Sequence, residues 1–397
     1  MTPSLTERAD QSGAFVAHAQ YGGLELSAAD HGPLAGLRCA VKDLFDIAGI
    51  ATGAGSPAWL ASHPVAEHDS VAVTRILAAG ATIIGKTVTD EMAWSLLGDN
   101  HHYGAPLNPR APDRLTGGSS AGSASAVASG LADIALGTDT GGSVRGPASF
   151  CGLWGMRPSH GRIPLDGVVP LAPSFDVVGW FAATIRHFCA IGPVLLDRPR
   201  PGPDVTRLLI AHDLFAAADD AVATGLQPAV TRVADVLGLS PQEIVLGRLD
   251  EWRKAFTILQ SAEIWTTHGD WVRRTQPDFG PGVRERFAAA AAITPDEVAK
   301  AEARRRESRA RLDDLLGEDA VLLAPSMPCP APMRASGPQE RDAFRARALN
   351  GLCPAGLAGL PQISMPLGEA DGAPVGLSLI GPRGADERLI EIARRMA

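Results

Sequence analysis

The chain has 397 residues, of which 45% are hydrophobic and 20% are charged, and its formal net charge is −8 at pH 7. This size and composition indicate a soluble globular protein with one large domain or two ordinary ones. The negative charge argues against nucleic acid or an anionic membrane as the main partner, because both bind clustered positive charge. The N-terminus lacks a charged-then-apolar leader pattern and no run of about 18 apolar residues occurs, so a cytoplasmic location is predicted.

The cysteines and lysines are the informative rare residues. Five cysteines are scattered without a CxxC pair, which disfavours a disulfide framework and a zinc site. Cys39 and Cys151 lie in apolar or glycine-rich stretches and are predicted to be small core residues. Only four of the 36 basic residues are lysines: Lys42, Lys86, Lys254 and Lys300. Because a buried lysine can lose its proton near neutral pH whereas arginine cannot, each lysine is a candidate for special chemistry.

From 34 to 192, apolar runs of strand length alternate with helical patterns. The runs "LRCAVKDLFDI" and "ATIIGKTV" are typical of buried strands, whereas "DSVAVTRILAAG" and "SSAGSASAVASGLA" have helical spacing. This alternation predicts an α/β sheet covered by helices on both faces.

The rest of the chain changes character twice. A proline-rich break at 197–204 is followed by helical periodicity over 205–316, and strand-like runs return over 317–397 before a C-terminal helix. A chain that leaves a sheet, forms helices and returns to strands favours a single domain, 1–397, with a helical excursion.

Three short motifs match the residue patterns of known functional sites, but the residues around them do not provide the structure that those sites need. "GATIIGKT", Gly80 to Thr87, fits the phosphate-binding pattern GxxxxGK[ST], but a helical pattern precedes it and its middle is strand-like, so nucleotide binding is not predicted. Lys86 is then expected to line the outer part of a site or to support structure. "GSSAG" fits a nucleophile elbow centred on Ser120, but no buried strand leads into it. The pair His101–His102 lacks a third ligand at metal spacing and is predicted to hydrogen-bond in a loop.

Lys42 lies in the apolar run "CAVKDLF", which predicts that its ammonium is buried. Burial lowers the pKa of a lysine and can make it a general base. The alternative is a structural lysine that reaches water or pairs with Asp43.

Two glycine pairs precede serines. Gly117 and Gly118 lead into Ser119 in "TGGSSAGS", and "GTDTGGSVRGPAS" has two further glycines before Ser143. Adjacent glycines allow unusual backbone angles, so successive N–H groups can converge on one point as an oxyanion hole. The predicted donors are Thr140, Gly141, Gly142 and Ser143.

These segments resemble the amidase signature family, and their motifs are closest to plant indole-3-acetamide hydrolase-like amidases. The resemblance runs from about 34 to 192 and resumes at "GLAGLPQISMPLG" and "PVGLSLIG" near the C-terminus. It implies the amidase signature fold, with a central mixed β-sheet covered by helices on both faces.

The resemblance also assigns roles by position within the motifs. It implies that Ser143 is the acylating nucleophile, that Ser119 relays the proton and has an unusual peptide bond, and that Lys42 is the base. Neutral Lys42 would accept a proton from Ser119, which would accept one from Ser143 during attack on an amide carbonyl. A Ser–Ser–Lys triad of this kind needs no metal, nucleotide or other cofactor.

The segments "TDEMAWS" and "SFDVVGWFA" are similar to stretches typical of indole-3-acetamide hydrolases. They imply an amide hydrolase that converts small apolar or aromatic primary amides to carboxylate and ammonia. The predicted substrate contacts are Met92, Gly117, Gly118, Gly146, Phe175 and Trp180. Gly146 stands where relatives usually carry a branched aliphatic residue, so we expect extra room for a bulky acyl group.

Other functions stay open from the sequence. The signature is shared by the glutaminase subunit of tRNA-dependent amidotransferases and by hydrolases of allophanate and other carboxylated ureas, for which Arg145 or Arg157 would bind the substrate charge. A non-catalytic binding module, similar to a chloroplast outer-envelope import receptor, is a further class, although all three triad residues are present and no helical repeat follows. The predicted partner is a small-molecule amide, with no nucleic acid and no membrane, and a homodimer is compatible with this prediction.

Overall fold

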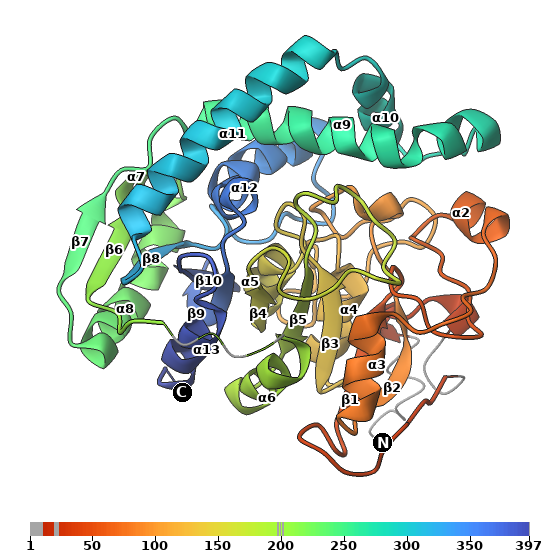
Figure 1. The fold of residues 1–397 in the computed structure, drawn as a ribbon, viewed down its shortest axis with the longest axis horizontal. Helices are drawn as coiled ribbons and strands as arrows, with labels where there is room; N and C mark the ends of the chain where they lie inside the picture. Colours follow the sequence, from red (N-terminus) through yellow and green to blue (C-terminus); the bar gives the residue numbers. More distant parts are fainter. Residues whose placement is uncertain (1–10, 20–23, 197, 199, 201, 397) are drawn as a thin grey trace.

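The computed structural model describes residues 11–19, 24–196, 198, 200 and 202–396, and its centre is a mixed β-sheet (Figure 1). The strands are β1 (Arg38–Lys42), β2 (Thr82–Thr87), β3 (Ile134–Thr138), β4 (Trp154–Arg157), β5 (Val178–Ala182), β6 (Arg207–Ala211), β7 (Pro241–Ile244), β8 (Ala320–Pro325), β9 (Gln362–Ala370) and β10 (Ala373–Ile380). They form one ten-stranded sheet in the order β2-β1-β3-β5-β4-β9-β10-β8-β6-β7. The two ends of this sheet, β2-β1-β3 and β8-β6-β7, are parallel, and the strands between them pair antiparallel.

The described helices are α2 (Pro57–Ser62), α3 (Val71–Ala78), α4 (Ala121–Ala128), α5 (Arg145–Cys151), α6 (Ile185–Leu195), α7 (His212–Ala216), α8 (Asp220–Leu237), α9 (Leu249–Thr275), α10 (Val283–Ala291), α11 (Pro295–Leu316), α12 (Pro338–Ala358) and α13 (Asp386–Arg394), with short 3-10 helices η1 (Ala17–Ala19) and η2 (Glu91–Ala93). Their ends follow the sequence: Ser70 caps α3 by accepting the Val73 N–H, and Thr294 and Glu297 form a capping box at the start of α11. None of the described helices is long and apolar enough to span a membrane.

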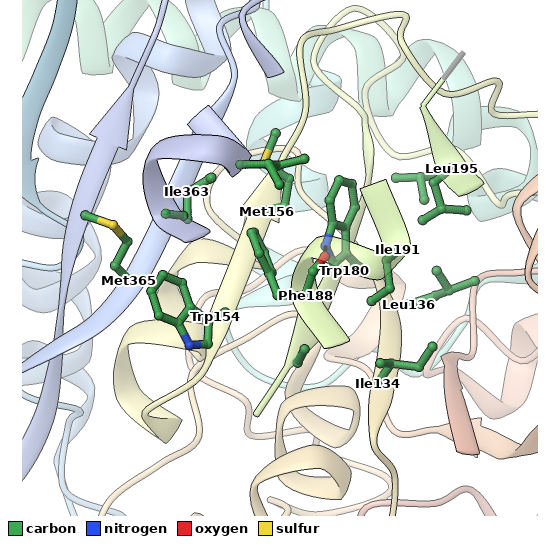
Figure 2. Close-up of a cluster of buried hydrophobic side chains, with 14 of the residues drawn as sticks. Ile134, Leu136, Trp154, Met156, Trp180, Phe188, Ile191, Leu195, Ile363 and Met365 are labelled. Carbon is green, nitrogen blue, oxygen red and sulfur yellow. Dashed lines mark hydrogen bonds between the residues drawn. The ribbon is translucent and has the colours of Figure 1, made fainter. Parts of the chain in front are cut away.

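Both faces of the sheet are covered, as the α/β prediction requires. Helices α3, α6, α8 and α13 pack over an apolar cluster that contains Val41 and Trp180 (Figure 2). Helices α4 and α5 pack over a second cluster that contains Ala40 and Phe181. Ala40 and Val41 are adjacent in β1, and Trp180 and Phe181 are adjacent in β5. Because successive side chains of a strand point to opposite faces, the two members of each pair belong to different clusters. Burial on both faces explains why the strands read as nearly continuous apolar runs.

Helices α9, α10, α11 and α12 form a further layer, which packs as a third apolar cluster. Figure 1 shows α9 and α11 lying along each other at the top of the molecule. The same cluster includes Leu44, Phe150 and Phe175, which come from the first half of the chain. This helical layer therefore closes over the segments that follow β1 and precede β5.

The segment 205–316 is less uniform than the predicted helical excursion. It contains α7, α8, α9, α10 and α11, but it also supplies β6 and β7, which extend the sheet in parallel from β8. The expectation of helices alone is therefore wrong for Arg207–Ala211 and Pro241–Ile244. Both strands are short, and the helical patterns around them hide the strand signal. The division of the domain at 34–192, 205–316 and 317–397 stays a prediction. Part of the predicted break at 197–204 lies outside the described residues.

Candidate active site

Lys42 is the last residue of β1 and is completely buried. It shares the α4 face of the sheet with Ala40, two residues earlier, so its side chain reaches the segment that precedes α4. The Nζ atom donates hydrogen bonds to Ser119 Oγ at 2.8 Å and to Thr138 Oγ1 at 2.7 Å. Lys42 therefore contacts the serine that the resemblance pairs it with, and also a threonine hydroxyl that the sequence did not indicate.

The surroundings of Lys42 favour its neutral form. Burial lowers the pKa of its ammonium from 10.5 to about 7, although the charges of Asp90 and Asp139 act in the opposite direction. The ion pairs of the described residues include none for Lys42. A lysine with a pKa this low is accessible in its neutral form near neutral pH.

The peptide bond between Gly118 and Ser119 is cis, which agrees with the unusual peptide that the resemblance implies. A side chain at position 118 would overlap the Asp90 carboxylate and the Gly98 backbone, so only glycine fits there. The Gly118 N–H donates to Leu96 O at 3.0 Å, and the Ser119 carbonyl accepts from the Asp90 N–H at 3.1 Å. The backbone on both sides of the Ser119 side chain is thus hydrogen-bonded.

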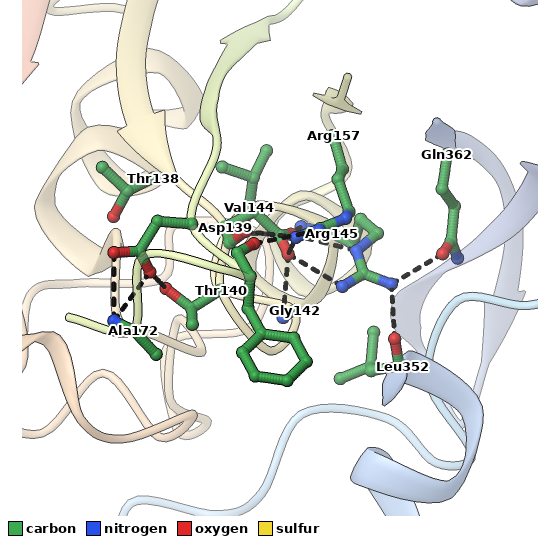
Figure 3. Close-up of polar contacts among 12 residues, drawn as sticks. Thr138, Asp139, Thr140, Gly142, Val144, Arg145, Arg157, Ala172, Leu352 and Gln362 are labelled. Atoms are coloured by element: carbon green, nitrogen blue, oxygen red, sulfur yellow. Dashed lines mark hydrogen bonds and ion pairs between the residues drawn. The ribbon is translucent and has the colours of Figure 1, made fainter. Parts of the chain in front are cut away.

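Asp139 organises the loop that carries Ser143 (Figure 3). Its carboxylate accepts the N–H groups of Gly142 at 2.9 Å and Val144 at 3.0 Å, and it pairs with Arg145 at 2.8 Å and Arg157 at 3.0 Å. Burial would raise the pKa of Asp139, but the two guanidinium groups outweigh it and hold that pKa far below its usual range. A charged carboxylate therefore holds the loop that contains Ser143 from within.

This arrangement changes the predicted oxyanion hole. The Gly142 N–H is bonded to Asp139, so its prediction as an oxyanion donor is wrong for this structure. The backbone of Gly142 has a φ of 116°, and a side chain there would overlap Leu352. In the part of the chain that the structure describes, the N–H groups of Thr140, Gly141 and Ser143 donate to no protein acceptor. These three donors stay available for a developing negative charge.

Ser143 lies in this loop and is 4% exposed. Its carbonyl accepts the Ser120 N–H at 3.3 Å, which ties the two serine segments together. Among the described contacts its hydroxyl has no hydrogen bond, so the proton link from Ser143 to Ser119 stays a prediction. Ser120, the centre of the elbow pattern, is fully buried and bonds through its hydroxyl to the Thr138 carbonyl at 3.3 Å.

A pocket of about 250 Å³ adjoins the site at Thr138. It is lined by Leu44, Thr138, Thr140, Leu165, Val168, Val169, Pro170, Leu171, Pro173 and Asp176. Most of these residues belong to one irregular segment between β4 and β5, residues 165–176, which we call the pocket wall. Asp176 is the only ionisable residue in this lining, and its carboxylate is engaged by the Thr140 hydroxyl and the Leu171 N–H. The pocket is therefore mainly apolar, with a polar end beside Lys42.

The six predicted substrate contacts do not line this pocket. Trp180 points to the other face of the sheet, where its Nε1–H donates to Phe188 O at 3.3 Å (Figure 2), so that prediction is wrong. Successive side chains of β5 point to opposite faces of the sheet, and this alternation turns Trp180 away from the site. The ring of Phe175 packs against Phe256 at 4.9 Å between centroids instead of facing the pocket.

The other four predicted contacts are also used elsewhere. Met92 is buried in the cluster of the helical layer, and Gly117 and Gly118 lie close to Phe150 and Asp90. The Met327 Sδ atom lies 3.5 Å from the position that a Cβ of Gly146 would occupy. Met327 therefore bounds the space beside Gly146, and the expected accommodation of a bulky acyl group there stays a prediction.

Arg145 and Arg157, the residues considered for a charged substrate, are both fully buried. Beyond Asp139, Arg145 donates to Leu352 O at 2.9 Å and to Gln362 Oε1 at 2.6 Å, and Arg157 donates to Phe175 O at 3.0 Å. Both guanidinium groups are therefore engaged within the protein and do not line the pocket.

The structure shows where the phosphate-loop pattern, the histidine pair and the two cysteines lie. Thr82–Thr87 is strand β2, so "GATIIGKT" is not a phosphate-binding loop, and Lys86 pairs with Asp43 Oδ1 at 2.8 Å. His102 lies 2.9 Å from Glu91 Oε1 in a loop. Cys39 and Cys151 are buried core residues, as predicted. Within the described ranges, no group of three or more metal-ligating side chains comes together.

Comparison with known proteins decides the family. The sequence profile described as Amidase matches residues 12–205 and 253–390. The chain is also 38% identical to "Amidase 1" of Arabidopsis thaliana, over 92% of this chain and 93% of that protein. The chain belongs to the amidase family. This amidase is an amide hydrolase, as the sequence predicted, and its family match omits 206–252, where β6, α7, α8 and β7 lie.

Two further relatives extend the comparison. A crystal structure described as an amidase superimposes with a TM-score of 0.84 at 30% identity and covers 99% of this chain and 94% of the other. This amidase is also 33% identical to the chloroplastic outer envelope protein 64 of Arabidopsis thaliana, over 92% of this chain and 66% of that protein. The predicted fold class is thereby confirmed.

Proposed function

We propose that this amidase cleaves small neutral amides through an acyl-enzyme on Ser143, with Ser119 relaying the proton to Lys42. The observation that carries the proposal is the environment of Lys42. It is buried, donates to Ser119 at 2.8 Å, has a pKa of about 7 and pairs with no carboxylate among the described residues. Such a lysine can accept a proton at neutral pH.

In the proposed reaction, Ser143 Oγ attacks the amide carbonyl carbon while its proton passes to Ser119 and the Ser119 proton passes to Lys42. The N–H groups of Thr140, Gly141 and Ser143 stabilise the negative charge on the carbonyl oxygen. The proton returns through Ser119 to the leaving nitrogen, and the C–N bond breaks to release ammonia from a primary amide. Water then attacks the acyl-enzyme, which releases the carboxylate and restores Ser143.

The pocket supports a neutral apolar or aromatic acyl group. Its side walls include Leu165, Val168 and Leu171, and apolar burial contributes about 25 cal/mol per Å². A substrate carboxylate would find no cation in this lining, and Arg145 and Arg157 are engaged elsewhere. Glutamine and carboxylated ureas are therefore less suited to the pocket than arylacetamides.

The nucleophile is tested by covalent trapping. A serine-directed reagent with a good leaving group should add mass at Ser143, and Ser143→Ala should fold but lose activity by several orders of magnitude. Ser120 and Ser143 both lie between Arg114 and Arg145, so a tryptic peptide must be fragmented to distinguish them. Labelling of Ser120 would support the elbow interpretation instead.

The substrate class is tested by ranking kcat/KM across phenylacetamide, indole-3-acetamide, butyramide, malonamate, glutamine and allophanate. Neutral amides should lead, with the aryl amides first. A lead of about tenfold or more for glutamine or allophanate would show that a charged-substrate site exists and that the apolar pocket does not select the substrate.

A further inference from the structure

The pocket wall, residues 165–176, has no helix or strand of its own, so its shape depends on the contacts that hold it. Its inner side is attached to the catalytic half of the molecule. The Val169 N–H donates to Leu44 O at 2.8 Å, and the Asp176 carboxylate accepts the N–H groups of Leu171 at 2.8 Å and Ala172 at 3.0 Å. These bonds leave the Pro170 carbonyl and Ser174 to other partners.

Helix α9 holds the wall at Pro170. His268 Nε2 lies 2.8 Å from Pro170 O, and because a carbonyl only accepts, Nε2 carries the hydrogen. His268 is 2% exposed, and burial lowers its pKa to about 4. The imidazole is therefore neutral at neutral pH and acts there as a hydrogen-bond donor.

Helices α9 and α11 together hold the wall at Ser174. The Glu263 carboxylate accepts the Ser174 N–H at 2.8 Å and also the Ser174 hydroxyl. Arg305 donates to Ser174 Oγ at 2.8 Å and to Ser174 O at 2.9 Å. The guanidinium also lies over the Phe175 ring, 4.3 Å from its centroid. All the polar groups of Ser174 are thus bound by two helices that lie far from it in the sequence.

We propose that Glu263, His268 and Arg305 form a clamp that fixes the width of the pocket and so decides the size of acyl group that the enzyme accepts. This inference rests on the proposed function, because it assigns the pocket to the acyl group. The three residues are positioning residues, since they contact the wall and none of their described contacts is with Ser119, Ser143 or Lys42. Pro170, Leu171 and Pro173 line the pocket between the two clamped points, so movement of either point changes the pocket itself.

The primary test compares Arg305→Ala with Arg304→Ala, its neighbour on α11. Arg304 pairs with Glu251 at 3.1 Å on the surface and does not contact the wall, so it is a matched control. A displacement of about 1 Å can cost on the order of a hundredfold in rate for a substrate that fills its site. For Arg305→Ala we expect kcat/KM for phenylacetamide to fall about tenfold through KM, and that for butyramide to fall less than about threefold. Arg304→Ala should change neither value.

Two further variants separate clamping from general instability. Arg305→Lys keeps the charge but loses the two-point grip, so its selectivity should lie between wild type and Arg305→Ala. His268→Gln keeps an N–H donor and should retain selectivity, whereas His268→Leu should lose it. An equal loss on both amides through kcat, or the same loss in Arg304→Ala, would overturn the clamp.

Hydrogen exchange gives a readout that does not depend on substrate. The amide hydrogens of Leu171 and Ala172 should exchange at least about tenfold faster in Arg305→Ala than in Arg304→Ala, because the wall opens more often. Unchanged exchange would overturn the clamp even if the enzyme hydrolysed neither amide, an outcome that would separately refute the proposed function. Faster exchange with unchanged selectivity in an active enzyme would refute the link to specificity and leave the proposed function intact.

Discussion

The surroundings of Lys42 and Lys86 can be compared directly, because these lysines lie at the ends of adjacent parallel strands, where Lys42 pairs with Thr87. Both side chains are completely buried. Lys42 contacts only hydroxyl groups among its described hydrogen-bond partners, whereas Lys86 lies 2.8 Å from the Asp43 carboxylate and donates to Thr52 Oγ1 at 2.9 Å. Burial is therefore shared by the two lysines, and the difference between them lies in their hydrogen-bond and ion-pair partners. Lys86 pairs with a carboxylate, whereas the described hydrogen bonds of Lys42 go only to hydroxyl groups, and burial lowers the pKa of Lys42 to about 7.

Asp43 shows how the two lysines come to differ. It follows Lys42 directly in the sequence, but its carboxylate pairs with Lys86 and accepts the Gly53 N–H at 3.1 Å. Adjacent residues of an extended chain point in opposite directions, so Asp43 turns away from Lys42. The alternative in which Lys42 reaches water or pairs with Asp43 is therefore wrong.

The strongest test of this comparison is substitution of Lys42. Lys42→Met and Lys42→Arg should both lower kcat by on the order of a thousandfold, because arginine keeps the charge but cannot accept a proton near neutral pH. Steady-state hydrolysis of phenylacetamide measures the loss, and thermal unfolding checks that the variants fold. Substantial turnover by Lys42→Arg would remove Lys42 from the role of base.

Substitution of Lys86 should affect stability instead. Lys86→Met leaves the buried Asp43 without its lysine, which should cost about 3–5 kcal/mol in the free energy of unfolding. Because Lys86 does not contact Ser119 or Ser143 in the described structure, the folded fraction should retain kcat within about threefold of wild type. Denaturant unfolding measures the first effect, and active-site titration normalises the second.

The exposed pair of Lys300 and Asp296 on α11 provides the control for Lys86. Lys300→Met should change stability little, because exposed pairs contribute little. A Lys86→Met protein that keeps its stability but loses its activity would contradict the structural role of Lys86.

The pH dependence should follow Lys42. Its pKa is lowered to about 7 by burial, and the proposed mechanism uses the neutral form as the base, so kcat/KM should rise with pH and level off above a midpoint near 7. Two pH units below the midpoint the value should be about a hundredfold lower. The profile is measured with a neutral amide, so that the substrate does not titrate. A profile that is flat or falls between about pH 5.5 and 8 would contradict the assignment.

Substitution of Thr138 should have a smaller effect on activity than substitution of Lys42, because Thr138 is the second hydrogen-bond acceptor for Lys42. Thr138→Val removes the hydroxyl at nearly constant volume and should lower kcat about tenfold, whereas Thr138→Ser should stay close to wild type. The protonated lysine loses an acceptor in the valine variant, so the kinetic midpoint should move to lower pH. An upward shift would show that Thr138 does not stabilise the charged form.

Much of the site was predictable from local sequence. The apolar run around Lys42 indicated a buried strand, and the paired glycines indicated tight backbone before Ser119 and Ser143. The family resemblance then connected these segments. The same reasoning missed Asp139, although a single carboxylate in the otherwise uncharged run "LGTDTGGS" was a visible signal. It also missed Arg305, because its run "EARRRESRARLDD" mixes arginines with acids at helical spacing, and such a pattern is typical of an exposed helix face.

The sequence alone determined the class of fold and the segments that carry the serines and the lysine, because backbone preference and side-chain periodicity act over a few residues. The family was indicated by the resemblance of the motifs. Only the tertiary structure decided that Lys42 contacts Thr138 rather than Asp43, and that Trp180 faces the opposite side of the sheet. It alone also brought Arg305 to Ser174, 131 residues away. Such pairings depend on which faces pack together across the whole chain, and no local pattern contains that information.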